Sequence, residues 1–204
     1  MSVLIIGANG NMGSRYKAIF NMLGIPHLGV DIGTSIEEAD HLIDSAERYL
    51  IATPTRTHTD WIRRLSTQRK PILCEKPICT KLDELDDILI DMHNHRVPFR
   101  MMYQYSMLGI PETSAASAYD YFKHGNDGLY WDCLQIIALA KGSVTLAEKS
   151  PIWRCQINGK ELNIGDMDWA YVNYLKLWND KPDQDWLEVF DAHAKVEELI
   201  GRVD

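Results

Sequence analysis

The sequence lacks any apolar run near the roughly 20 residues that a membrane-spanning helix needs, so we expect no transmembrane segment and no membrane partner. It also lacks a basic block, since 21 lysines and arginines are outnumbered by 29 aspartates and glutamates. A net charge of -8 argues against an electrostatic nucleic-acid binder. No charged leader with a cleavage site precedes the first apolar segment, so we expect no signal peptide.

Cysteine is scarce, and the four cysteines show no disulfide framework. Cys74 and Cys133 have apolar neighbours in the sequence and are expected to be buried thiols. This favours a reduced, cytoplasmic setting. His93 and His95 match no zinc-site spacing with Cys74 and Cys79, so we expect no metal. A chain of 204 residues that is 46% hydrophobic can build one sizeable core, or one full domain with a smaller partner.

The first half of the chain alternates short apolar runs with amphipathic helical segments. This alternation predicts an α/β domain over residues 1–105, with a parallel sheet and covering helices. Asp31 and Arg48 are so close in sequence that one helix-plus-strand unit is expected to be shortened between them. The predicted strands are 2–6, 27–31, 48–52, 71–74 and 98–103, and the predicted helices are 11–23, 35–41, 59–68 and a helix that begins at 80.

After residue 105 the pattern changes to that of a small α+β domain, which we place at 106–204. Asn158-Gly159 is a strong hairpin signal between two of its strands. The strands in 143–164 leave edges that a second copy could cover, so we expect a homo-oligomer formed through this domain. The predicted helices are 119–124, 130–140, 169–178 and 185–200, and the predicted strands are 143–147, 152–157 and 161–164.

A glycine-rich turn follows the first strand, with Gly7, Gly10 and Gly13 spaced as G-x-x-G-x-x-G. A dinucleotide site needs a tight strand-to-helix turn, a backbone that can approach phosphate, and close helix–strand packing. Gly10 would allow the close approach, and free N–H groups around it would face a pyrophosphate at the helix N-terminus. The residues expected to contact the cofactor here are Gly7, Asn9, Gly10, Asn11, Met12 and Gly13.

Asp31 ends the second strand and is the acidic residue that such a site requires. Its carboxylate can accept hydrogen bonds from the adenosine ribose hydroxyls and would repel a 2′-phosphate, which favours NAD over NADP. The alternative is an ordinary strand-to-helix turn with Asp31 as a plain loop residue.

The chain resembles the Gfo/Idh/MocA oxidoreductases, a family that includes glucose-fructose oxidoreductase and inositol dehydrogenase. Three segments carry the resemblance, and together they lie within residues 2–105: Ile5–Gly13, Ile51–His58 and Leu73–Pro77. The resemblance implies a Rossmann-type first domain that binds NAD or NADP. The second domain is shorter than the family usually has.

The resemblance also implies roles for single residues. Lys76 would lie near the nicotinamide and the substrate hydroxyl as the acid/base, and the peptide before Pro77 would be cis. A lysine with an ordinary pKa of ~10.4 is a poor base, but burial and a nearby cationic ring can lower that pKa toward roughly 7–8. The other residues that would lie along the cofactor are Thr53, Pro54, Thr55, His58, Glu75 and Pro77.

The family's Asp-x-Gly-x-His-x-x-Asp segment has only a partial counterpart. Asp132 fits its first position and is a second catalytic candidate, with a polar residue on a buried helix face as the alternative. Ile136 and Leu139 occupy the places of the histidine and the second aspartate, unless Gln135 serves with a one-residue shift. The expected substrate contacts are Tyr103, Tyr105 and Gln135, although core packing explains the tyrosines equally well.

These observations lead to one principal hypothesis about function. It is an NAD(P)-dependent oxidoreductase that transfers hydride between nicotinamide and a small sugar- or polyol-like substrate. Two alternatives remain open. One is a nucleotide-binding sensor or assembly protein without turnover, and the other is a structural oligomer.

Overall fold

The computed structural model describes residues 2–79, 81–108, 113–121, 140–150, 154–157, 160–161 and 167–200. The chain divides into two compact units. The first comprises residues 1–102 together with 178–186, and the second comprises 103–177 together with 187–204. The predicted boundary at 105 stays a prediction, but the short segment 178–186 joins the first unit from far along the chain.

The first unit is built on a five-stranded parallel sheet with the order β2-β1-β3-β4-β5. Every strand predicted for this half is present. β1 pairs with both β2 and β3, and the connection between β2 and β3 carries one helix. The expected shortening of this unit stays a prediction. The strands are β1 (Val3–Ile6), β2 (His27–Val30), β3 (Arg48–Ile51), β4 (Ile72–Cys74) and β5 (Phe99–Met101).

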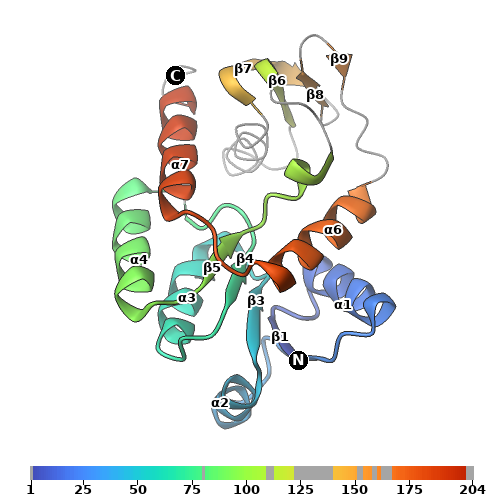
Figure 1. Ribbon diagram of the computed structural model, residues 1–204, viewed down its shortest axis with the longest axis vertical. Coiled ribbons are helices and arrows are strands. Elements are labelled where there is room, and N and C mark those ends of the chain that lie inside the picture. The colour runs from blue at the N-terminus through green and yellow to red at the C-terminus, as the bar shows by residue number, and fades with distance from the viewer. Residues whose placement is uncertain are drawn as a thin grey trace. The chain divides into compact units, whose positions relative to one another are not determined.

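Four helices connect these strands, namely α1 (Asn11–Leu23), α2 (Ile36–Ser45), α3 (His58–Ser66) and α4 (Leu82–His95). Right-handed crossovers place α1 on one face of the sheet and α3 and α4 on the other, as Figure 1 shows. Gly24 ends α1 in the left-handed conformation, with φ of 66°. Ser35 Oγ accepts the Glu38 N–H at 3.2 Å at the start of α2, which continues to Ser45, beyond the predicted end.

The core of this unit follows from the apolar strands. All four residues of β1 are at most 1% exposed, as expected for a strand covered on both faces. Tyr49 in β3 is also fully buried, and its hydroxyl donates to the Ile43 carbonyl at 2.8 Å. Burial raises the pKa of Tyr49 to about 12, so its hydroxyl stays protonated and keeps this bond.

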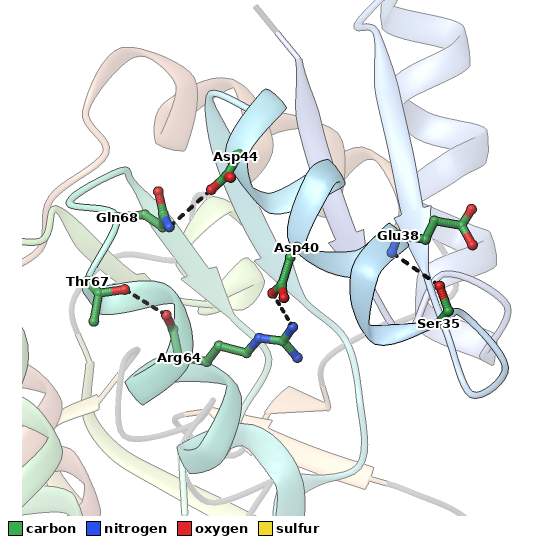
Figure 2. Close-up of polar contacts among 7 residues, drawn as sticks. All are labelled: Ser35, Glu38, Asp40, Asp44, Arg64, Thr67 and Gln68. Atoms are coloured by element: carbon green, nitrogen blue, oxygen red, sulfur yellow. Dashed lines mark hydrogen bonds and ion pairs between the residues drawn. The ribbon is translucent and has the colours of Figure 1, made fainter.

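Polar contacts connect α2 with α3 and with the turn that follows α3 (Figure 2). Arg64 pairs with Asp40 at 2.6 Å, and Gln68 Nε2 donates to Asp44 Oδ1 at 3.3 Å. The Arg64 and Asp40 side chains are 37% and 61% exposed, so their pair contributes about 0.2–1 kcal/mol at most. These contacts connect two helices that each pack on the sheet.

Arg48 at the start of β3 contacts the segment 178–186, which belongs to the same unit. Its guanidinium donates to the carbonyls of Trp178 and Asn179 at 2.9 and 3.0 Å and lies 5.5 Å from the centre of the Trp178 ring. Those carbonyls belong to the last turn of α6 (Met167–Asp180), where a helix lacks internal donors and favours a cation.

We therefore expect Arg48→Ala to lower the free energy of unfolding by about 1.5–3 kcal/mol, the range for hydrogen bonds made by a charged group. Chemical denaturation of the folded chain measures this change. Arg63→Ala is the control, since Arg63 is an exposed arginine on α3. Equal stability of the two variants would contradict the capping role of Arg48.

The second unit contains a four-stranded sheet with the order β7-β6-β8-β9. β6 pairs with β7 in parallel and with β8 antiparallel, and β8 and β9 are antiparallel. The strands are β6 (Thr113–Tyr121), β7 (Ala140–Ser150), β8 (Arg154–Ile157) and β9 (Lys160–Glu161). The predicted helices at 169–178 and 185–200 are present as α6 and α7 (Trp186–Ile200).

Two predictions for this unit are wrong in part. Residues 119–121 were expected in a helix but end β6, and Ala140 was expected to end a helix but begins β7. The physical reason is pairing on both sides of β6, which fixes the extended conformation and overrides local helical spacing. Residues 122–124, 130–139 and the Asn158-Gly159 turn lie outside the described residues. Within the described part of the chain, none of the helices is long and apolar enough to cross a membrane.

Candidate functional site

The glycine turn after β1 is packed tightly against its neighbours at two of its three glycines. Gly7 has φ of 84°, and a Cβ there would lie 2.9 Å from the Ala52 carbonyl oxygen. A Cβ on Gly13 would lie 2.1 Å from the Gly7 carbonyl oxygen. At Gly10 a Cβ would meet only that same oxygen, at 3.4 Å. Gly7 and Gly13 therefore fix the turn, whereas Gly10 faces open space where a ligand can approach.

The N-terminus of α1 is open to an anion. Gly10 is its N-cap, with no side chain that accepts from the first turn, and the first turn carries no acidic residue. Asn9, Gly10 and Asn11 are exposed, and Met12 is half-buried. The first-turn N–H groups of a helix have no intrahelical partner, and they carry partial positive charge. This geometry fits the pyrophosphate of a dinucleotide.

Asp31 lies beside this turn, directly after β2. Its Oδ2 accepts the Asn9 N–H at 2.6 Å and its Oδ1 accepts the Ile32 N–H at 2.7 Å. Lys17 Nζ donates to Asn9 Oδ1 at 3.1 Å on the same side. A surface pocket of about 310 Å³ opens here, lined by Ala8, Asn9, Lys17, His27, Leu28, Gly29, Asp31 and Thr34. Asp31 thus holds the turn and still offers carboxylate lone pairs to hydroxyl groups.

The Thr53–His58 segment follows β3, at the edge next to the glycine turn. Thr53 and Thr55 are half-buried and Pro54 is exposed, so all three have surface that a ligand can reach. His58 differs, since it is 1% exposed and each of its ring nitrogens lies within hydrogen-bond distance of a backbone carbonyl oxygen. Its imidazole therefore connects segments of the protein and does not face solvent.

Glu75, Lys76 and Pro77 follow β4. Glu75 is buried, its Oε1 accepts the Tyr16 hydroxyl from α1, and its Oε2 accepts the Lys76 N–H at 3.2 Å. The Lys76–Pro77 peptide is cis and Lys76 is half-buried. Tyr16 is a residue of this site that was not predicted from the sequence. The available signal was a tyrosine on the buried face of a helix, whose hydroxyl needs a partner.

The remaining predicted residues belong to the second unit or lie outside the described residues. Tyr103 and Tyr105 are 5% and 7% exposed in the second unit, which leaves little surface for a substrate in this structure. Burial raises the pKa of Tyr103 well above its ordinary value. Asp132 and Gln135 lie outside the described residues. Within the described ranges, no group of three or more histidine, cysteine or acidic residues could hold a metal.

The first unit therefore brings three segments to one edge of its sheet. β1, β3 and β4 are parallel neighbours, so the turns that follow them meet at their carboxyl ends. The sheet order reverses between β1 and β3, and open α/β sheets bind their ligands at that position. Fold and site together define a Rossmann-type nucleotide-binding unit.

Comparison with known proteins agrees with this class. Residues 27–102 match the Gfo/Idh/MocA family, described as an oxidoreductase family with an NAD-binding Rossmann fold. The resemblance found in the sequence is thereby confirmed for this part of the chain. A curated relative, glucose-6-phosphate 3-dehydrogenase from Bacillus subtilis (strain 168), is 36% identical over 52 residues. That match spans 26% of this chain and 15% of the relative.

Solved structures share the fold at low sequence identity. A UDP-N-acetylglucosamine 3-dehydrogenase from Acidithiobacillus ferrooxidans has a TM-score of 0.71 at 12% identity, over 98% of this chain and 96% of that one. A Thermus thermophilus dehydrogenase in complex with NAD and UDP-GlcNAcA has a TM-score of 0.70 at 10% identity, over 96% and 93%. A myo-inositol dehydrogenase from Corynebacterium glutamicum has a TM-score of 0.68 at 13% identity, over 98% and 96%.

Proposed function

We propose that the chain is an NAD-dependent oxidoreductase that transfers hydride between nicotinamide and a CH–OH or carbonyl group of a small substrate. The observation that carries this proposal is the meeting of three turns at the switch point of the sheet. One is a glycine turn with an open helix N-terminus, one bears Thr53 and Pro54, and one bears Lys76. Asp31 adds the acidic group beside the first of them.

NAD supplies the hydride acceptor or donor when it is bound. The chain's own residues hold it. The first-turn N–H groups of α1 bind the pyrophosphate, and the close approach depends on the missing side chain of Gly10. Asp31 accepts the ribose hydroxyls and disfavours a 2′-phosphate by charge repulsion. Thr53, Pro54, Thr55 and Glu75 line the path toward the nicotinamide end.

Lys76 handles the proton. When an alcohol is oxidised, its hydroxyl must lose a proton while hydride leaves the same carbon, and a neutral amine at Lys76 accepts that proton. In the opposite direction the ammonium donates it to the forming alkoxide. Lys76 is half-buried and its backbone N–H is held by the Glu75 carboxylate, so the residue starts from an anchored backbone.

The relatives suggest the class of substrate. They are named for glucose 6-phosphate, UDP-N-acetylglucosamine and myo-inositol, which are sugars or cyclic polyols. We therefore propose a sugar- or polyol-like substrate. The second catalytic role of Asp132 and the substrate contact of Gln135 remain proposals that rest on the family resemblance. The substrate contacts of Tyr103 and Tyr105 remain proposals that rest on their place at the end of the last parallel strand. The homo-oligomer formed through the second unit and the cytoplasmic setting also remain predictions.

Titration with NADH and with NADPH, followed by cofactor fluorescence, tests the cofactor site. We expect the wild type to prefer NADH, and Asp31→Ala to weaken NADH binding about tenfold to a hundredfold, the range for charge-assisted hydrogen bonds. Asp31→Asn keeps an oxygen for the Asn9 N–H but removes the charge, so the relative affinity for NADPH should rise. Asp86→Ala on α4 is the exposed control.

The outcomes separate the competing functions. No binding of either cofactor to the wild type would refute the proposal. Saturable NADH binding without hydride transfer to any member of a sugar and polyol panel would favour the nucleotide-binding sensor.

A further inference from the structure

His58 connects two of the three turns that form the candidate site. It is the first residue of α3 and is 1% exposed. Its Nδ1 lies 2.8 Å from the Pro77 carbonyl oxygen and its Nε2 lies 2.7 Å from the Thr53 carbonyl oxygen. Thr53 follows β3 and Pro77 follows β4, so one ring spans the ends of two neighbouring strands.

Both partners are carbonyl oxygens, which only accept hydrogen bonds. A neutral imidazole has one N–H, and its other nitrogen would direct a lone pair at the second oxygen. Only the imidazolium donates from both nitrogens at once. Both hydrogen bonds therefore form at once only when the ring is charged, and each is then charge-assisted and stronger than its neutral counterpart.

The groups around the ring have opposing effects on the pKa of His58. Burial lowers the pKa of His58, because the charged ring loses hydration. The Thr53 and Pro77 carbonyls, the carboxylate of Glu75 and the backbone of Ile78 act in the raising direction. Glu75 is the charged side chain that acts on the ring among the described residues. It also accepts the Lys76 N–H, so the same carboxylate favours the charged ring and holds the backbone of the lysine.

We propose that His58 is a positioning residue, which as an imidazolium ties the Thr53 turn to the Pro77 turn and so fixes the backbone from which Lys76 projects. Loss of the ring proton leaves one of the two carbonyls without its donor. The ring then donates to the Thr53 carbonyl or to the Pro77 carbonyl, but not to both, and no longer links the two turns. The arrangement of the proposed acid/base thus depends on the protonation of a histidine that touches neither cofactor nor substrate.

The importance of these two His58 hydrogen bonds for catalysis rests on the proposed function. The hydrogen bonds themselves can be tested without any cofactor. Nitrogen-15 spectra of the histidine rings in the folded wild-type chain report how many ring nitrogens carry a proton. We expect His58 to show two protonated nitrogens at the acid end of a pH series and one at the alkaline end, with a midpoint below that of an ordinary histidine because burial lowers the pKa of the ring. One protonated and one bare nitrogen throughout the series would overturn the proposal.

The second readout is Lys76 itself. Reductive methylation with carbon-13 keeps the lysine charge and gives each lysine a signal, and Lys76→Arg assigns the one from Lys76. We expect this signal to shift with the same midpoint as the His58 ring. The shift should vanish in His58→Gln, which has a donor on one nitrogen only, and persist in His41→Gln, an exposed histidine on α2.

If the Lys76 signal of the wild type does not shift at the pH where the His58 ring titrates, the positioning role is refuted, whether or not His58→Gln folds. Failure of the chain to bind NADH would refute the proposed function and leave both spectroscopic results unchanged. The two proposals can therefore fail separately.

Discussion

Replacing Gly13 with alanine should disrupt the first unit, whereas the same change at Gly10 should leave it folded. The added Cβ at Gly13 would lie 2.1 Å from the Gly7 carbonyl oxygen and 2.8 Å from two backbone atoms of Ala8. These are main-chain atoms held by the sheet, so α1 would have to move away from β1. We expect a loss of about 3 kcal/mol or more in the free energy of unfolding, at the upper end of overpacking effects. Urea denaturation measures it.

Gly10→Ala is the matched control, because its Cβ would meet only the Gly7 carbonyl oxygen, at 3.4 Å. Its stability should stay within about 1 kcal/mol of the wild type, since Gly10 precedes the helix in an extended conformation with φ of -68°. NADH binding should nevertheless weaken by tenfold or more, as the methyl group enters the space kept for the pyrophosphate. Equal destabilisation by the two substitutions would contradict the separate roles assigned to these glycines.

The sequence predicted the glycine turn because its constraints are local. A buried strand, three glycines and a helix that ends at Gly24 lie within one short stretch, and each has its own chemical signature. The alternation of strands and helices was predictable for the same reason, whereas the order of the strands in the sheet was not predicted.

Contacts between distant segments were not predictable in the same way. Tyr16 lies on the buried face of α1, and its hydroxyl reaches Glu75 after β4. His58 was assigned to the cofactor, but it is buried between two carbonyls. A sequence pattern shows which face of a helix is buried. It does not show which polar atom of another segment meets a side chain on that face.

The second unit illustrates the same limit for strands. Residues 119–121 follow a run of alanine and serine that carries little strand preference, yet they extend the central strand β6. β6 is fixed by β7 and β8, which come later in the chain. Strand preference depends on neighbours across the sheet, so local spacing was a poor guide.

Replacing Lys76 with alanine should lower turnover by a factor of 10²–10⁴, the usual contribution of a general acid or base, with little change in NADH affinity. The reason is that α1 and Asp31 hold the adenosine and pyrophosphate end, whereas Lys76 acts only on the proton of the substrate hydroxyl. Steady-state NADH formation with the best member of a sugar and polyol panel measures the change. Lys81→Ala is the control, since Lys81 is an exposed lysine shortly after the same turn.

Lys76→Arg separates charge from proton transfer. Arginine keeps the positive charge but does not give up its proton near neutral pH, so this variant should bind substrate and still turn over slowly. In the oxidative direction the wild-type kcat/KM should rise with pH until the lysine is deprotonated, and that rise should be absent in both variants. If a Lys76 variant kept the wild-type pH profile, the proton would belong to another group. If the wild type itself showed no turnover, the sensor function would gain support.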